Sequence, residues 1–161
     1  MKKLRSNSIL RDVKHYFGYL LDGGYQIRSL ACHSEAFGNW EVIFESSACA
    51  IQVSCDRNEV FVEFAPAKSD MKRLIGLGSM IFYLSEGQQI VGHFEGKLFG
   101  GRKKQLQKMA DLLRAYLDKI APFFGTQSGL YEAELLLAQE SYNRVLLQRR
   151  MSSIKEGKLS R

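Results

Sequence analysis

Apolar residues recur at helical spacing in the first part of the chain and at strand spacing in the next. Residues 8–22 carry apolar positions three and four apart, which predicts an amphipathic helix ended by Gly23-Gly24. Between residues 25 and 65, apolar and polar residues alternate, as is typical of strands with one buried face. The alternation predicts four strands, at about 25–33, 40–46, 48–55 and 59–65. Asp56-Arg57-Asn58 predicts a hairpin turn in which Asn58 takes a positive φ.

Helical spacing returns after the strands. It predicts three more helices, at about 70–85, 102–121 and 130–149, the first of them capped by Ser69 or Asp70. The glycine-rich residues 87–101 are expected to form a loop, and 126–129 a short linker. The apolar pattern fades after Arg149, so residues 152–161 are expected to be a frayed basic tail.

These elements predict an α+β fold: a four-stranded, mainly antiparallel sheet (about 25–65) with helices on one face and a long C-terminal helix. We expect one α+β domain over residues 1–125 and a helical extension over 126–161. The chain has 161 residues, enough to bury a core without disulfides or metal. Its 45% hydrophobic and 25% charged residues exclude the disordered and collagen-like classes.

Charge is uneven along the chain, whose formal net charge is +6. Residues 25–99 are net acidic and the segments on either side are net basic. The asymmetry fits either solubility alone or a charged partner. The start of the chain lacks the apolar core of a signal peptide, and no apolar run approaches the roughly 18 residues of a membrane span. We therefore expect a cytoplasmic protein with free thiols and no membrane contact.

Residues able to do chemistry form no recognised motif. The three cysteines include no C-x2-C pair, and Cys49 and Cys55 fall on the apolar side of their strand. The three histidines have no partner visible in the sequence, and no nucleophile motif is present. We therefore expect no catalytic residues, no metal and no cofactor, and a protein that is not an enzyme.

The polar side of the predicted sheet carries carboxylates around two apolar residues. If Trp40, Val42 and Phe44 point inward, their neighbours point outward. The predicted outward set is Glu41, Ile43, Glu45, Phe61 and Glu63. Charges around apolar anchors are typical of protein-binding surfaces. The face predicts a basic protein partner; an ordinary solvated sheet face is the alternative.

A basic cluster opens the third predicted helix. It consists of Gly101, Arg102, Lys103 and Lys104. Cations at a helix N-terminus oppose the helix dipole, and a bound anion would offset that repulsion. The cluster and the basic C-terminal tail therefore predict anion or nucleic-acid binding as an alternative function, with a solvated turn as the simpler reading.

The final helix has an apolar stripe of its own. The stripe consists of Tyr131, Leu135, Ala138, Tyr142 and Val145. An isolated helix of about 20 residues is marginal in water, so this stripe needs a surface to cover. That surface is either the chain's own core or a second subunit, which would make a homodimer.

Three segments carry a resemblance to known proteins. They are residues 16–25, residues 37–42 (FGNWEV) and residues 51–60 (IQVSCDRNEV). Together they resemble a pattern in small uncharacterised bacterial proteins, some of which resemble immunity proteins of toxin–immunity loci. Asn58 stands where that pattern has glycine. The resemblance implies a helix–sheet scaffold that binds a protein, and so a non-enzymatic interaction protein of immunity or adaptor type.

Overall fold

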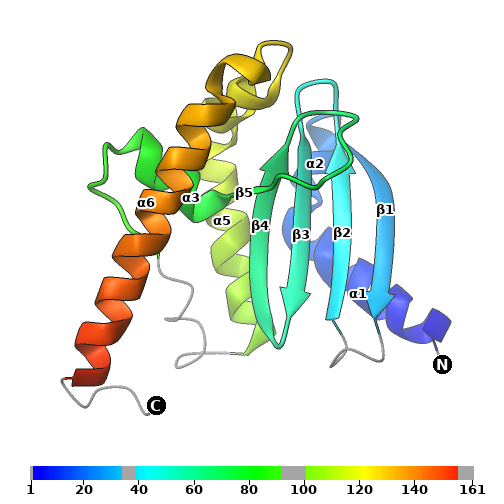
Figure 1. Ribbon diagram of the computed structural model, residues 1–161. Coiled ribbons are helices and arrows are strands. Elements are labelled where there is room, and N and C mark those ends of the chain that lie inside the picture. The colour runs from blue at the N-terminus through cyan, green and yellow to red at the C-terminus, as the bar shows by residue number, and fades with distance from the viewer. Residues whose placement is uncertain (1, 34–38, 92–100, 156–161) are drawn as a thin grey trace.

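The protein forms an antiparallel sheet of five strands with helices around it (Figure 1). The structure is a computed structural model that describes residues 2–33, 39–91 and 101–155. The strands are β1 (Gln26–His33), β2 (Asn39–Glu45), β3 (Ala50–Asp56), β4 (Glu59–Ala65) and β5 (Ile75–Gly76). The helices are α1 (Lys2–Phe17), α2 (Tyr19–Asp22), α3 (Leu77–Leu84), α5 (Arg102–Ile120), the 3-10 turn η1 (Ala121–Phe124) and α6 (Ser128–Lys155). The predicted α+β class is confirmed, with a fifth short strand that the pattern did not predict.

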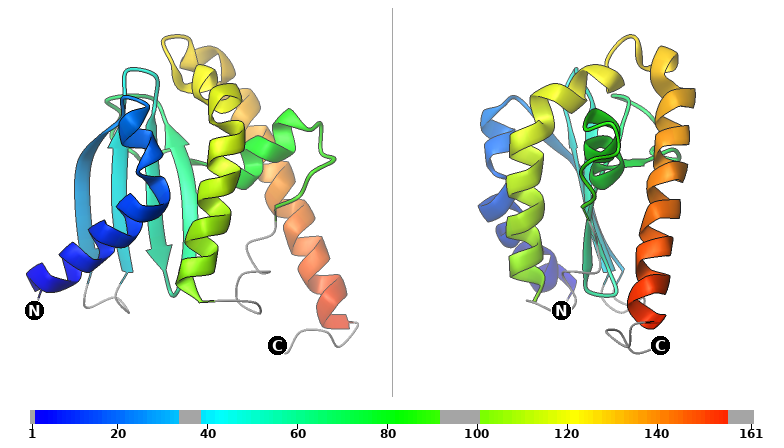
Figure 2. Two further views of the ribbon diagram at one scale, coloured as in Figure 1. Left: turned by 180° about the vertical axis from the view of Figure 1, so that it is seen from behind. Right: turned by 90° about the vertical axis from the view of Figure 1, so that its left-hand side faces the viewer.

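The strands follow one another as a meander, in the order β1-β2-β3-β4-β5. Pairing of Val42 with Val53 and of Val53 with Val62 places three apolar side chains in one row across the sheet. This row and its neighbours are buried under α1, α2 and α5, which all lie on the same side of the sheet (Figure 2). The alternation in the sequence therefore predicted correctly which side chains of the strands are buried, because the side-chain period of a strand is two.

The turn between β3 and β4 has two residues with positive φ, Arg57 (47°) and Asn58 (66°). This is the backbone of the tight turns that suit a twisted hairpin, and the prediction for Asn58 is confirmed. Gln105 of α5 holds the hairpin from the side. Its side-chain amide accepts from the Val60 N–H and donates to the Asn58 carbonyl, both at 3.0 Å.

The prediction of a helix over 70–85 is wrong in its first half. Residues 66–74 form an irregular segment, and Ile75-Gly76 pairs with β4 before α3 begins at Leu77. Lys68 (59°) and Met71 (57°) have positive φ, which a right-handed helix does not allow. Neither Ser69 nor Asp70 caps α3; residue 76 takes that place. The helical spacing of the apolar residues was misleading because Ile75 serves the sheet rather than a helix face.

The other helices differ from expectation mainly at their ends. The first helix begins at Lys2 rather than near Ser8, and it is broken at Gly18, after which α2 starts at Tyr19. The last helix is longer than predicted at both ends and continues through Lys155, so the expected fraying does not apply to residues 152–155. Residues 156–161, and residues 92–100 of the predicted loop, lie outside the described part of the chain.

Helix α6 packs on α3 and on the edge strand β5. The Gln139 side chain accepts from the Gly76 N–H at 2.9 Å and donates to the Leu74 carbonyl at 3.2 Å, which satisfies backbone groups at the sheet edge. Tyr142 is buried, and its hydroxyl donates to the Val91 carbonyl. Burial raises the pKa of Tyr142 to about 12, so the hydroxyl keeps the proton it donates.

Candidate functional site

The predicted outward residues share the sheet face that α1, α2 and α5 leave uncovered. The register pairs Ile43 with Gln52 and Gln52 with Glu63, and the next row pairs Glu41 with Ser54 and Ser54 with Phe61. Residues 66–74 cross part of this face, and α6 lies on the same side of the sheet (Figures 1 and 2). We call the surface formed by Glu41, Gln52, Ser54, Phe61 and Glu63 the outer face.

Two members of the predicted set have other roles. Ile43 is only 7% exposed, so it supports the sheet rather than offering an anchor to a partner. Glu45 accepts from the Arg28 guanidinium at 2.8 Å and from the Lys68 N–H at 2.7 Å. The N–H bond first, and then the arginine, hold the pKa of the Glu45 carboxyl below its usual range. Glu45 therefore fastens residues 66–74 over the sheet.

In the described part of the chain, the outer face holds two carboxylates that are not ion-paired. Among the residues that the structure describes, neither Glu41 nor Glu63 has an ion-pair partner. Burial first, and the charge of Glu41 second, raise the pKa of the Glu63 carboxyl. Phe61 lies half-buried in the same row as Glu41. The arrangement is an acidic surface around an aromatic ring, and a cation placed between the two carboxylates would lower its energy.

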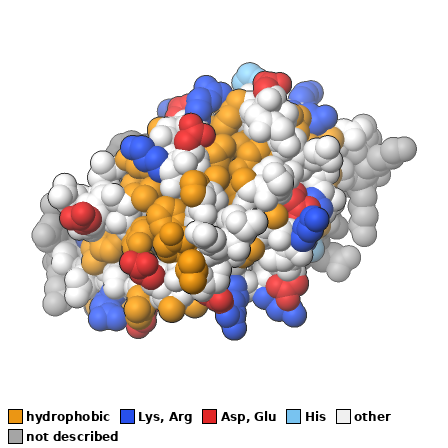
Figure 3. Space-filling view, turned by 90° about the horizontal axis from the view of Figure 1, so that it is seen from above, with side chains coloured by type: hydrophobic (Ala, Val, Ile, Leu, Met, Phe, Trp, Pro, Cys, Tyr) orange, Lys and Arg blue, Asp and Glu red, His pale blue; other side chains and the backbone are white. Residues whose placement is uncertain are grey.

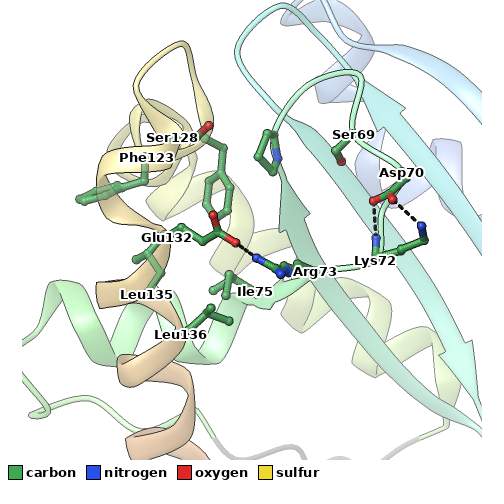
Figure 4. Close-up of a pocket in the computed structure, with 13 residues that line it drawn as sticks. Ser69, Asp70, Lys72, Arg73, Ile75, Phe123, Ser128, Glu132, Leu135 and Leu136 are labelled. Carbon is green, nitrogen blue, oxygen red and sulfur yellow. Dashed lines mark hydrogen bonds and ion pairs between the residues drawn. The ribbon is translucent and has the colours of Figure 1, made fainter.

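A pocket of about 420 Å³ lies beside this face, between residues 66–75, η1 and the first turns of α6 (Figure 4). Its apolar lining includes Ile75, Phe124 and Leu135, one from each of these segments. Seen from above, hydrophobic side chains gather on this end of the molecule between scattered charged groups (Figure 3). The volume suits a small ligand or a few side chains of a protein partner.

Ion pairs lie along the rim of the pocket. Arg73, which precedes β5, pairs with Glu132 of α6, and Lys72 pairs with Asp70 at 2.9 Å. Both pairs are largely exposed, so their contribution to stability is small. The rim carries two cations and two anions, so it favours neither a positively nor a negatively charged ligand.

The predicted anion-binding residues are partly committed within the chain. Arg102 donates to Asp12 of α1 at 3.0 Å and so joins α5 to α1. Lys103 and Lys104 are exposed in the first turn of α5, and Gly101 precedes them with no side-chain cap on the helix. Arg102 therefore joins two helices, whereas the side chains of Lys103 and Lys104 are exposed to solvent.

The predicted stripe on the last helix faces the chain's own core. Leu135 and Tyr142 are 3% and 1% exposed, and the Tyr131 ring packs edge-on against Phe123 at 5.0 Å. Ala138 and Val145 are half-buried on the same side. Of the two alternatives for this stripe, the geometry supports packing on the chain's own core.

Other reactive groups form no site in the described ranges. No group of three or more His, Cys, Asp or Glu residues there could hold a metal ion. Cys49 is buried, with its sulfur 3.2 Å from the Tyr25 hydroxyl, and burial raises the pKa of its thiol. His93 lies outside the described residues. None of the helices described there is long and apolar enough to cross a membrane.

No protein-family model matches the chain, and neither a curated protein nor a solved structure shows significant similarity to it.

Sequence reasoning missed the pocket because three segments far apart in the chain build it. Leu135 belongs to the helix predicted over 130–149, whereas Pro66 and Phe124 lie between predicted elements, and the wrong helix over 70–85 hid most of the segment between Pro66 and Ile75. One signal was present: Pro66 and the polar residues 68–70 are typical of a loop rather than a helix start.

Proposed function

We propose that this protein is a non-enzymatic interaction protein, of immunity or adaptor type, that binds a basic segment of a partner protein on its outer face. The observation that carries the proposal is the pair Glu41 and Glu63, which have no cation among the described residues. The raised pKa of the Glu63 carboxyl means that ionisation costs free energy in the folded protein. A lysine or arginine from a partner would recover part of that cost.

Phe61 supports the same function. An aromatic ring beside charged groups is typical of the anchors that dominate binding energy at protein interfaces. The pocket adjoining the outer face offers room for an apolar side chain of the same partner. The face thus combines charge that attracts the partner with apolar contact that retains it.

The alternative, anion or nucleic-acid binding at the start of α5, has less support. Arg102 is held by Asp12, so the cluster offers fewer cations to a ligand than its sequence implies. Nucleic-acid binding at this site would weaken steeply with salt, because its driving force includes the release of counterions from the phosphates.

Site-specific photo-crosslinking tests the proposal. A photoreactive phenylalanine analogue replaces Phe61 in the native host, and a second chain carries it at Ala115, an exposed position on α5. We expect a partner adduct at residue 61 and none at residue 115, with the adduct mapping to a lysine- or arginine-rich segment. Purified partner is then titrated against Glu41→Lys and against the control Asp118→Lys, an exposed charge on α5.

The expected result is at least about tenfold weaker binding for Glu41→Lys and unchanged binding for Asp118→Lys. Equal adducts at both positions, or equal affinities for the two charge variants, would remove the outer face from consideration.

A further inference from the structure

Helix α6 has a second apolar stripe, on the side that faces away from α3. Within the described residues, the large hydrophobic side chains that are exposed all belong to α6. Four of the five, Leu130, Leu137, Leu147 and Met151, are between 51% and 74% exposed. Exposed apolar side chains gathered on one helix indicate a surface that another protein covers.

The spacing of this stripe is regular over the whole helix. Its positions are separated alternately by three and four residues: Leu130, Ala133, Leu137, Glu140, Arg144, Leu147, Met151 and Ile154. This is the spacing of the contact positions in a two-stranded coiled coil. Leu135 and Tyr142, which are buried against the core, lie on the opposite side of the helix. We call the eight positions the seam.

The seam is symmetric about residue 142. Counting outward from that point, Glu140 is matched with Arg144 and Leu137 with Leu147; the outer matches are Ala133 with Met151 and Leu130 with Ile154. A two-fold axis at this point would place each member against its match on an antiparallel copy of the helix. A parallel copy would instead place Glu140 against Glu140 and Arg144 against Arg144.

We propose that α6 forms the interface of a homodimer, in which it packs antiparallel against α6 of a second copy of this chain. Charge complementarity selects this occupant. Glu140 of each chain meets Arg144 of the partner subunit, and leucines meet leucines on either side of that layer. A polar layer inside an apolar seam fixes the register of the two helices, at some cost in stability.

The seam is accessible in the single chain. Glu140 and Arg144 form an exposed ion pair at 3.2 Å along the helix, which can exchange for pairs across the interface. The C-terminal part of α6 extends past the end of α3 (Figures 1 and 2). A second helix packed along this end would stabilise it, because helices gain most of their stability from packing.

Sedimentation equilibrium of the full chain tests the dimer. The expected mass at about 100 µM is twice the 18.3 kDa of one chain. Leu137→Lys with Leu147→Lys should raise the dissociation constant at least about 100-fold, because it places charges in the apolar layers. Ala115→Lys on α5 is the matched control and should leave the mass unchanged. Circular dichroism of each variant checks that the monomer is folded.

Charge exchange provides a variant that keeps the composition of the seam. Glu140→Arg alone places four arginines in the central layer and should weaken the dimer at least about tenfold. Adding Arg144→Glu to the same chain restores opposite charges across the two-fold axis. The double variant should recover the dissociation constant to within about threefold.

Cysteine cross-linking tests the direction of pairing. Ala133→Cys chains mixed with Met151→Cys chains should cross-link to each other under mild oxidation. Ala133→Cys alone should not exceed the background of the unsubstituted chain, because its two copies would be about 27 Å apart along the helices. A monomer at about 100 µM refutes self-association and leaves the seam to a different protein. A dimer that survives the lysine variants, or that cross-links at residue 133 alone, refutes this interface.

Discussion

Gly78 of α3 lies directly against the Tyr142 side chain of α6, and its replacement by alanine tests the packing of the two helices. An ideal Cβ at residue 78 would lie 2.7 Å from Cζ of Tyr142 and closer still to the hydroxyl oxygen. Tyr142 has little room to move, because it is buried and its hydroxyl is bonded to the Val91 carbonyl.

The balance of terms predicts a loss of stability for Gly78→Ala. Overpacking costs about 1–3 kcal/mol, and disturbing the hydrogen bond of Tyr142 costs about 1 kcal/mol. Alanine gains about 1 kcal/mol over glycine inside a helix. The free energy of unfolding should therefore fall by about 1–3 kcal/mol, as measured by urea denaturation.

Gly129→Ala is the matched control, because a Cβ at residue 129 of α6 meets no atom within 4 Å. It should leave stability unchanged or raise it by up to about 1 kcal/mol. Adding Tyr142→Phe removes the nearest atom, so the loss caused by Gly78→Ala should shrink by at least about 0.5 kcal/mol in that background. If Gly78→Ala stabilises the protein as much as Gly129→Ala does, α6 does not pack on α3 in this way.

Three further predictions concern the outer face and the core. Because the pKa of the Glu63 carboxyl is raised, the folded state holds that proton more tightly than the unfolded state, so stability falls as pH rises through the ordinary carboxyl range. Glu63→Gln should flatten this fall in urea titrations from about pH 4 to 7, and an unchanged pH profile would count against it. Leu135→Ala should lower the free energy of unfolding by about 2–5 kcal/mol, against less than about 1 kcal/mol for Leu136→Ala, which is 41% exposed and lies outside the seam; equal losses would contradict the assignment of the inner side of α6. Arg102→Met should cost on the order of 1 kcal/mol through the half-buried pair with Asp12, and the loss should shrink in high salt, as thermal unfolding at two salt concentrations would show.

Strands and their faces followed from the sequence, because a period of two places alternate residues on opposite sides whatever the strand packs against. The alternation around Val42, Val53 and Val62 therefore predicted both the sheet and the side on which Glu41 and Glu63 lie. It did not predict that Glu63 would be desolvated beside Glu41, because that depends on what lies near the outer face.

The region after β4 was decided by tertiary structure. The apolar spacing through Ile75 matches a helix, yet pairing with β4 and the left-handed backbone at Lys68 and Met71 prevent one. Long-range pairing can override a local pattern, because the hydrogen bonds of an edge strand come from residues distant in sequence. Residues 66–75 line the pocket, so the pocket could not be predicted from the sequence either.

Helix α6 shows most clearly which features the sequence predicts and which ones tertiary packing decides. The sequence by itself predicted a helix here and its inner stripe, but neither the continuation of the helix to Lys155 nor the seam. Which side is internal was decided by α3, where the missing side chain of Gly78 makes room for Tyr142, and by the backbone of β5, which Gln139 satisfies. Periodicity specifies a helical face, but only the surface it meets decides whether that face is core or interface.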